Sequence, residues 1–330
     1  MSGAGLFVVV NHTAARARAA WPRVRESLVR AGVEFEAHES TQQGETEERT
    51  RDALGRGFET VAAVGGDGTL SAAASGFFEP CAGLSEGGRP RAVNPGASLA
   101  PLPSGTGDDF ARGLSGGRRA PLEAWVARLV RHCRAAAAGE ETTAKRVDLL
   151  LGSVDGGARR FICLNAATLG IGAEVAARVA AQGRAARRLP GEARFALAAL
   201  PRLAAWRNRR VRVAVDGSVW QECGTNLLAV LNGAYAGGGM KLSPEARPDD
   251  GLLDVLAVAD ISRPALLREL SRVHTGGHVN SPHVKLARAA HVRVETLDPS
   301  DSLGVEADGD VRGHTPADFR VMPAALSVIC

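Results

Sequence analysis

The residue pattern best suited to chemistry is a glycine-rich segment, Gly65–Thr69, with the sequence GGDGT. It directly follows the apolar, β-branched run Thr60–Val64 and precedes Leu70–Phe77, whose composition is helical. Glycine lets a backbone pass close to a ligand, and a helix N-terminus presents unpaired N–H groups to an anion. This unit therefore favours phosphate binding over a plain tight turn. Asp67 would contact Mg²⁺ or a ribose hydroxyl, or order the loop.

A second segment of this kind is Pro103–Leu114, with the sequence PSGTGDDFARGL. Its Ser104–Gly107 run offers hydroxyls and backbone N–H groups that suit a phosphate chain. Asp108 and Asp109 stand where a helix begins, and one of these carboxylates could reach a metal ion or the first loop. The simpler interpretation is a helix that one of the two acids caps after a loop. The residues alone leave both interpretations open.

Two turns that carry carboxylates lie in the second half of the chain. The first is Asp249–Gly251, within PEARPDDGLLD, and its oxygen ligands suit Mg²⁺. In the second, Asp308 and Asp310 flank a glycine after the strand-like run Leu303–Ala307. Either acid could serve as a general base toward a substrate hydroxyl. Taken alone, each turn is more typical of a β-hairpin.

The elements that must position these segments change character along the chain. Strand-like and helix-like runs alternate up to residue 143, which predicts a parallel sheet with flanking helices. From residue 144 onward, β-rich runs dominate and predict antiparallel strands. We therefore expect an α/β domain over 1–143, which carries the two glycine-rich segments, and a second domain built mainly on antiparallel strands over 144–330. Within the first domain, Glu79–Pro101 is expected to form a long loop because it is rich in glycine and proline.

Composition and charge exclude several classes of protein. The chain has 330 residues, 45% of them hydrophobic, which is enough for two domains with real cores. Its formal charge of +4 suits a polyanionic cofactor or an anionic membrane surface, and is too small for a nucleic-acid footprint. There is no secretory signal pattern, and no run reaches the roughly 18 apolar residues of a membrane span. Five scattered cysteines without a CxxC pair are typical of a cytoplasmic protein.

The four segments fit none of the commonest nucleotide motifs. A Walker A loop is absent, the glycine spacing differs from GxGxxG, and the HRD and DFG elements of protein kinases are missing. In order, and over nearly the whole chain, the segments instead resemble the diacylglycerol kinase catalytic family, in particular soluble bacterial lipid kinases related to sphingosine and ceramide kinases. The resemblance rests on Asn11 after the first strand, followed by GGDGTLS, PSGTGDDFAR, PEARPDDGLLD and ADGD. GGDGT is shared with NAD kinases, but the combination is specific.

This resemblance implies an α/β nucleotide-binding domain over 1–143 followed by a mainly antiparallel β-sandwich domain for a lipid substrate over 144–330. It also implies an active site in the cleft between the two domains, with ATP and Mg²⁺ as cofactors and a lipid hydroxyl as acceptor. Diacylglycerol and sphingoid lipids are the acceptors it implies. The metal would bind the Asp250 carboxylate and the carbonyls of Arg247 and Leu252. The family's general base falls on Asp310, with Asp308 as the neighbouring candidate. The ATP-binding residues that the resemblance implies are Asn11, His12, Thr13, Ala14, Ala15, Thr41, Gly65, Gly66, Asp67, Gly68, Thr69, Leu70, Ser71 and Thr106.

Several positions depart from the family pattern. NHTAA stands where the family has NPxSG, Asp108 replaces an asparagine, and Ser71 stands where an asparagine is frequent. Asp310 is one methylene shorter than the family's glutamate. Because of these departures, a nucleotide- or lipid-binding regulatory protein without catalysis remains an alternative. A second alternative is a NAD-kinase-like enzyme, against which the GTGDDFAR and PDDGLLD segments argue.

The basic segment Gly183–Arg212 bears on partners. It interleaves arginines with leucine, phenylalanine and tryptophan, as an amphipathic helix on an anionic leaflet would. An ordinary solvated helix over the second domain is the slightly favoured alternative. We expect a lipid substrate, peripheral contact with a membrane surface and no nucleic-acid partner. The sequence is compatible with a homodimer but does not fix the oligomeric state.

Overall fold

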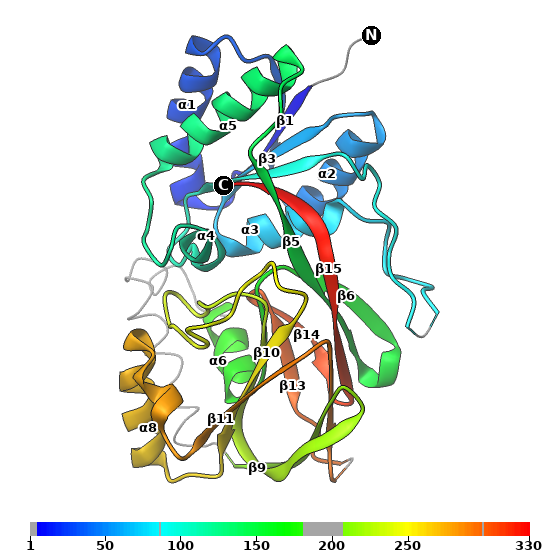
Figure 1. Cartoon of the computed structure of the whole chain (residues 1–330), viewed down its shortest axis with the longest axis vertical. Helices are drawn as coiled ribbons and strands as arrows, with labels where there is room; N and C mark the ends of the chain where they lie inside the picture. The colour runs from blue at the N-terminus through cyan, green and yellow to red at the C-terminus, as the bar shows by residue number, and fades with distance from the viewer. Residues whose placement is uncertain (1–4, 86, 181–206, 299) are drawn as a thin grey trace. The chain divides into compact units, whose positions relative to one another are not determined.

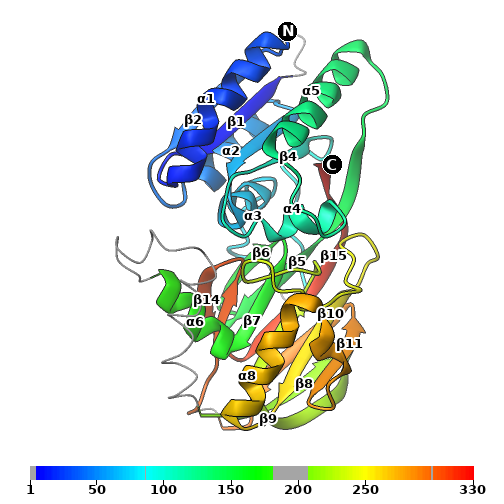
Figure 2. The same cartoon turned by 90° about the vertical axis from the view of Figure 1, so that its left-hand side faces the viewer.

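The computed structural model describes residues 5–85, 87–180, 207–298 and 300–330 (Figures 1 and 2). The chain folds into two compact units. Unit 1 contains Met1–Val147 together with Ala324–Cys330, and unit 2 contains Asp148–Pro323. The division after Val147 lies close to the change of character after residue 143 in the sequence. The return of the last segment of the chain to unit 1 is a feature that this change does not indicate.

Unit 1 is built on a parallel sheet with the strand order β2–β1–β3–β4–β15. The strands β1 and β3 consist almost entirely of buried residues, as expected for strands covered by helices on both faces. The strands are β1 (Leu6–Asn11), β2 (Phe35–Ser40), β3 (Thr60–Gly65), β4 (Ser98–Pro103) and the end of β15 (Ala317–Ile329).

Helices cover both faces of this sheet. On one face, Trp21 and Leu28 of α1 and Trp125 and Leu129 of α5 form a core with the strands. Figure 1 shows α2 and α3 across the sheet from α1 and α5. The helices of unit 1 are α1 (Ala15–Arg30), α2 (Glu45–Gly55), α3 (Asp67–Gly76), α4 (Asp109–Leu114) and α5 (Leu122–Ala138).

The strand β4 contradicts the expectation of a long loop over Glu79–Pro101. β4 pairs with β3 along its whole length, including Pro101 and Pro103. Among the described residues, β15 pairs with β4 only at Ser98 and Leu99. The two prolines therefore lie where β4 has an open edge, and a missing N–H there breaks no ladder bond. Their presence makes a buried strand look like a loop in the sequence.

Unit 2 is a mostly antiparallel β-sandwich, which confirms the predicted fold class. Its central strand, β9, pairs antiparallel with β7, β8 and β10. β5 begins in unit 1 and β15 ends there. The strands are β5 (Ala144–Val154), β6 (Arg159–Cys163), β7 (Ala166–Gly170), β8 (Arg209–Val215), β9 (Ser218–Leu231), β10 (Leu253–Ala259), β11 (Val284–Ala289), β12 (His291–Thr296), β13 (Gly304–Ala307) and β14 (Asp310–His314).

Two α-helices of unit 2 are described, α6 (Ile171–Ala180) and α8 (Arg263–Arg272). Residues 183–206 of the basic segment Gly183–Arg212 lie outside the described residues, so the predicted amphipathic helix is not part of this description. Within the described ranges, no helix combines the length and the apolar character needed to cross a bilayer.

Candidate active site

The loop after β1 is held to the start of α3 by Asn11. Asn11 Nδ2 donates a hydrogen bond to Thr69 Oγ1 at 3.0 Å. Asn11 Oδ1 accepts from the Thr13 backbone N–H at 3.1 Å and from the Thr13 hydroxyl at 2.6 Å, so the side chain also closes a local turn. The structure thus brings together two groups of predicted nucleotide residues, Asn11–Ala15 and Gly65–Ser71.

Three other residues that were predicted to bind ATP lie around this loop. Two of them have a glutamate as a local partner, and the third begins a helix. His12 Nδ1 lies 2.5 Å from Glu39 Oε2, so an anion there would compete with a carboxylate. The Thr41 N–H donates to Glu45 Oε2 at 2.6 Å, which leaves the Thr41 hydroxyl for a ligand. No described side chain caps α1, which begins at Ala15, and the N–H groups of its first turn therefore suit an anion.

The two glycine-rich loops pack backbone against backbone. A Cβ atom added to Gly105 would lie 2.6 Å from Gly66 Cα, and one added to Gly65 would lie 2.3 Å from Thr69 Oγ1. Ser104 N–H donates to Gly65 O at 2.8 Å, which links the ends of β3 and β4. Glycine at these positions is required by close approach of protein atoms, whereas the sequence indicated only an approach to a ligand at GGDGT. The loops form one surface at the carboxyl ends of two adjacent parallel strands, where α/β sheets bind ligands.

The start of α3 offers backbone donors to this surface. The first hydrogen bonds within the helix are donated by the N–H groups of Thr69 and Leu70 to Gly66 O, both at 3.0 Å. The N–H groups of Asp67 and Gly68 precede these bonds and have no carbonyl within the helix. Leu70 and Ser71 are buried, and the Leu70 N–H is already used within the helix. Thr106, on the second loop, is exposed.

Asp67 acts as a link between the loops. Its Oδ1 accepts a hydrogen bond from the Phe110 N–H at 3.2 Å, at the start of α4. Burial, and after it the nearby Asp109 charge, raise the pKa of Asp67 to about 7, against backbone hydrogen bonds from Asp109 and Phe110 that lower it. Of the three roles that the sequence left open, loop structure is the one with a contact in this structure.

Asp108 closes the second loop instead of capping α4 with its side chain. Its backbone is left-handed, with φ of 51°. Oδ1 accepts from the Gly105 N–H at 2.8 Å, and Oδ2 accepts from Arg119 at 2.7 Å. The side chain that accepts a hydrogen bond from the start of α4 is therefore Asp67, whereas the sequence suggested Asp108 or Asp109 as the cap. Asp108 stands where the family has asparagine, and its added negative charge is paired with Arg119.

In unit 2, the ADGD turn separates the two candidate bases. The Asp308 carboxylate accepts hydrogen bonds from the backbone N–H groups of Leu164, Asn165 and Ala166, at 2.6, 3.1 and 3.1 Å. Asp310 has a side chain that is 53% exposed, and Arg312 lies 3.5 Å from its Oδ2. Asp308 is thus committed to holding the turn on the loop between β6 and β7. Of the two acids, Asp310 is the one whose carboxylate is largely exposed.

A buried acid that sequence reasoning missed supports the same turn. Glu306, on β13, accepts from the Thr168 hydroxyl at 2.6 Å and from the Gly309 N–H. Burial raises the pKa of Glu306 to about 7, and these two hydrogen bonds oppose the shift. Glu306 and Asp308 therefore fix the turn from two sides, and Asp310 projects from a rigid support. The one available signal was a charged residue between two apolar residues of a strand.

Glu306 makes stability depend on pH. Because its pKa is about 7 in the folded protein and 4.5 ordinarily, the folded state holds a proton that the unfolded state loses. This contribution is complete below pH 4.5 and is lost as pH rises through about 7. We expect Glu306→Gln to remove this loss and to raise the free energy of unfolding at pH 8, relative to the parent, by roughly 1–3 kcal/mol. Urea unfolding at pH 5 and pH 8 measures it.

The matched control is Glu245→Gln, because Glu245 is an exposed glutamate of the same unit. This variant should keep the parent's decrease in stability between the two pH values. If Glu306→Gln showed the same decrease as Glu245→Gln, the proton would not reside on Glu306.

The predicted metal turn presents a carboxylate that already has a cation. Arg288 pairs with Asp250 Oδ2, and the Leu252 N–H donates to Asp250 Oδ1 at 3.1 Å. The side chain of Arg247 pairs with Asp249 at 3.1 Å, which leaves its carbonyl as the atom for a metal. In the described ranges, no group of three or more His, Cys, Asp or Glu could hold a metal ion. The turn supplies oxygen atoms that suit Mg²⁺, which would have to displace Arg288.

This competition gives a prediction for Mg²⁺. In Arg288→Ala, the Asp250 carboxylate loses its ion-pair partner and keeps only the Leu252 N–H, while 18% of its side chain is exposed. We expect the variant to be less stable without Mg²⁺ and to gain melting temperature at severalfold lower Mg²⁺ concentrations than the parent. Thermal melting in a Mg²⁺ titration without nucleotide measures this effect. Arg288→Ala combined with Asp250→Asn should lose the response, and a response that survives would place the metal elsewhere.

Two arginines of unit 1 were also missed. Arg16 Nη1 and Arg119 Nη2 both donate to the Gly105 carbonyl, at 3.0 and 3.1 Å. They bring positive charge to the second loop from different elements of unit 1. Arg16 directly follows NHTAA, so its position could have been read from the sequence. Arg119 lies in a loop after α4, and only the fold places it beside Gly105.

Comparison with known proteins covers both units. The diacylglycerol kinase catalytic domain family matches residues 5–140, and the YegS C-terminal NAD kinase beta sandwich-like domain family matches residues 168–330. A probable lipid kinase YegS-like protein of Pseudomonas aeruginosa is 33% identical over 300 residues, which cover 90% of this chain and 85% of the relative.

Solved structures agree on the fold. A putative diacylglycerol kinase from Bacillus anthracis has a TM-score of 0.72 at 19% identity, covering 100% of this chain and 98% of the other. An NAD kinase from Archaeoglobus fulgidus in complex with ATP has a TM-score of 0.51 at 14% identity, covering 99% and 93%. Identities this low bear on the fold alone. The family matches and the Pseudomonas relative, together with the packed GGDGT loop and the supported ADGD turn, show that this chain belongs to the lipid kinase family of YegS-like proteins and diacylglycerol kinases.

Proposed function

We propose that this lipid kinase transfers the γ-phosphoryl group of ATP to a hydroxyl of diacylglycerol or a sphingoid lipid. The observation that carries the nucleotide assignment is the contact between Gly66 and Gly105. It joins two glycine-rich loops at the ends of adjacent parallel strands and leaves the donors at the start of α3 for phosphate oxygens. The ATP-binding residues are those that the family resemblance implies, from Asn11 to Thr106.

The proposed mechanism is direct transfer without a covalent enzyme intermediate. Asp310 accepts the proton of the lipid hydroxyl, the hydroxyl oxygen attacks the γ-phosphorus, and the bond to the β-phosphate oxygen breaks to release ADP. Backbone N–H groups at the start of α3 stabilise the charge on the phosphates. Asp310 is assigned because its carboxylate is exposed, whereas Asp308 accepts three backbone hydrogen bonds.

Mg²⁺ belongs to the proposal as well. The Asp250 carboxylate and the carbonyls of Arg247 and Leu252 would hold it, once Arg288 has released Asp250. Bound there, Mg²⁺ would supply positive charge at this turn. We also propose a cytoplasmic enzyme that contacts the membrane peripherally, because its acceptor lipids reside in membranes.

The test is incubation of the purified protein with γ-phosphate-labelled ATP, Mg²⁺ and a total lipid extract, with NAD as acceptor in a parallel reaction. We expect label in a lipid phosphate and none in NADP. Label in NADP alone would establish a NAD-kinase-like enzyme instead. ATP binding without label in any acceptor would favour a regulatory protein that has lost catalysis.

A further inference from the structure

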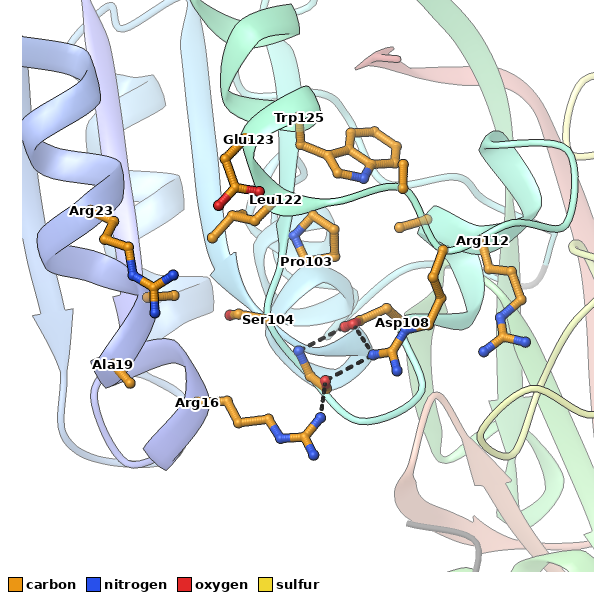
Figure 3. A pocket seen from close by; sticks show the side chains of 15 residues that line it. Arg16, Ala19, Arg23, Pro103, Ser104, Asp108, Arg112, Leu122, Glu123 and Trp125 are labelled. Carbon is orange, nitrogen blue, oxygen red and sulfur yellow. Dashed lines mark hydrogen bonds and ion pairs between the residues drawn. The ribbon is translucent and has the colours of Figure 1, made fainter. Parts of the chain in front are cut away.

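A cavity of about 380 Å³ lies in unit 1 between α1, α5 and the second glycine-rich loop (Figure 3). Its volume is within the usual range for small-molecule sites, roughly 300–1,000 Å³. Ala20, Leu122 and Trp125 contribute an apolar wall. None of the residues assigned to ATP lines it, and it adjoins the proposed nucleotide site through Gly105, which contacts Gly66.

The charge around the cavity favours an anion. Arg16, Arg23, Arg112 and Arg119 line it, against two carboxylates, Asp108 and Glu123. Asp108 is already satisfied by Arg119 and the Gly105 N–H. Figure 3 shows Arg23 and Glu123 on opposite walls, with no ion pair drawn between them. Guanidinium groups in this number suit a phosphate, which can accept several of their donors at once.

A hydroxyl group adds an independent sign of a ligand. Ser104 Oγ is buried and has no hydrogen-bond partner among the described residues. Figure 3 shows this hydroxyl directed toward the α1 side of the cavity. A buried hydroxyl without a partner loses free energy that a bound acceptor would restore. A phosphate oxygen in the cavity is such an acceptor.

We propose that this cavity binds a phosphate monoester on a small, partly apolar group and thereby regulates the enzyme. Arg16 and Arg119 both donate to the Gly105 carbonyl, and Gly105 contacts Gly66. A phosphate that engages these guanidinium groups competes with that carbonyl, so binding is coupled to the ATP loops. The coupling rests on the proposed function, whereas the binding does not. A phosphate monoester is also the product class of a lipid kinase, which makes product feedback the regulation that this site provides.

The first test is calorimetric titration of the whole protein with glycerol 3-phosphate, with saturating ATP present to fill the nucleotide site. Arg23→Ala should weaken binding about tenfold or more, the effect of one lost charge-assisted hydrogen bond. Arg25→Ala removes an exposed arginine of the same helix that does not line the cavity, and it should bind like the parent. Ser104→Ala should weaken binding without loss of thermal stability, because its hydroxyl has no described partner. Equal affinities in Arg23→Ala and Arg25→Ala, or no binding by the parent, would overturn the site.

A second arm identifies the source of the phosphate. Vesicles of phosphatidylcholine with phosphatidic acid replace glycerol 3-phosphate, and pure phosphatidylcholine vesicles are the blank. Loss of vesicle binding in Arg23→Ala assigns a lipid headgroup, and loss of glycerol 3-phosphate binding alone assigns a free phosphate ester. Loss of neither overturns the proposal. ATP titrations without phosphate monoester test the proposed function separately, so the two failures are distinguishable.

Discussion

Asp310→Asn is expected to lower kcat by about 10²–10⁴-fold, the usual scale for loss of a general base. The affinity for ATP should stay unchanged, because the proposed nucleotide residues all belong to unit 1. Thermal stability should stay near that of the parent, because the Asp310 side chain is 53% exposed and its contact is Arg312 at 3.5 Å. Steady-state kinetics with a lipid acceptor and ATP titrations measure both quantities. Asp310→Glu restores the family's residue and should retain activity.

Asp308→Asn separates a structural role from a catalytic one. An amide in place of the Asp308 carboxylate would direct an N–H₂ group toward backbone N–H donors of Leu164, Asn165 and Ala166. We expect the free energy of unfolding to fall by about 1–3 kcal/mol. Activity should also fall, because the turn that carries Asp310 is displaced. A variant that melted like the parent but lost its rate would move the base to Asp308. Normal rates in both variants would remove the turn from the mechanism.

Gly105→Ala is expected to have the second large effect, which is a loss of ATP affinity. The added methyl carbon would lie 2.6 Å from Gly66 Cα and 2.7 Å from Asp108 Oδ1, so the two loops must separate. Overpacking of this kind costs about 1–3 kcal/mol, which corresponds to an ATP affinity lower by about 10–100-fold if the strain is released by moving the loop. Calorimetric titration with ATP measures this loss. Gly66→Val should act in the same direction.

The matched control is Gly113→Ala, in the helix that follows the same loop. A Cβ atom there meets no atom within 4 Å, and alanine favours a helix over glycine. This variant should bind ATP like the parent and be as stable or more so. If both alanine variants bound ATP equally well, the contact between the loops would not shape the nucleotide site.

Local pattern was enough to predict the elements that carry the motifs. Apolar, β-branched runs before Asn11 and GGDGT are buried strands, and the change from alternating to β-rich runs marks the β-sandwich. Glycine at 65 and 66 was predicted to let the backbone approach a ligand, and the close approaches in this structure are to Thr69 and to Gly105 of the second loop. These features depend on residues near one another in sequence, or on a backbone requirement that only glycine meets.

The roles of the carboxylates could not be predicted in this way. Asp67 finds its acceptor role with Phe110, 43 residues away, and Asp308 finds its three donors more than 140 residues away. In sequence, each looks like an acid in a turn. The same limit applies to Glu306, whose partner Thr168 lies on a neighbouring strand. A carboxylate's function depends on which donors the fold brings to it.

The sheet of unit 1 cannot be completed until the last residues of the chain, in β15, have been synthesised. The β15 residues Ser327 and Val328 pair with β4, and Ile329 belongs to the core beneath α1 and α5. While the ribosome is still translating unit 2, the nascent unit 1 therefore lacks one strand, and the β4 edge at Ser98 and Leu99 has no partner strand. An unpaired strand edge of this kind can pair with other chains until β15 has been made. A nonsense mutation just before Ala324 would for that reason remove a strand segment from unit 1, whose other residues all come from the first 147 of the chain.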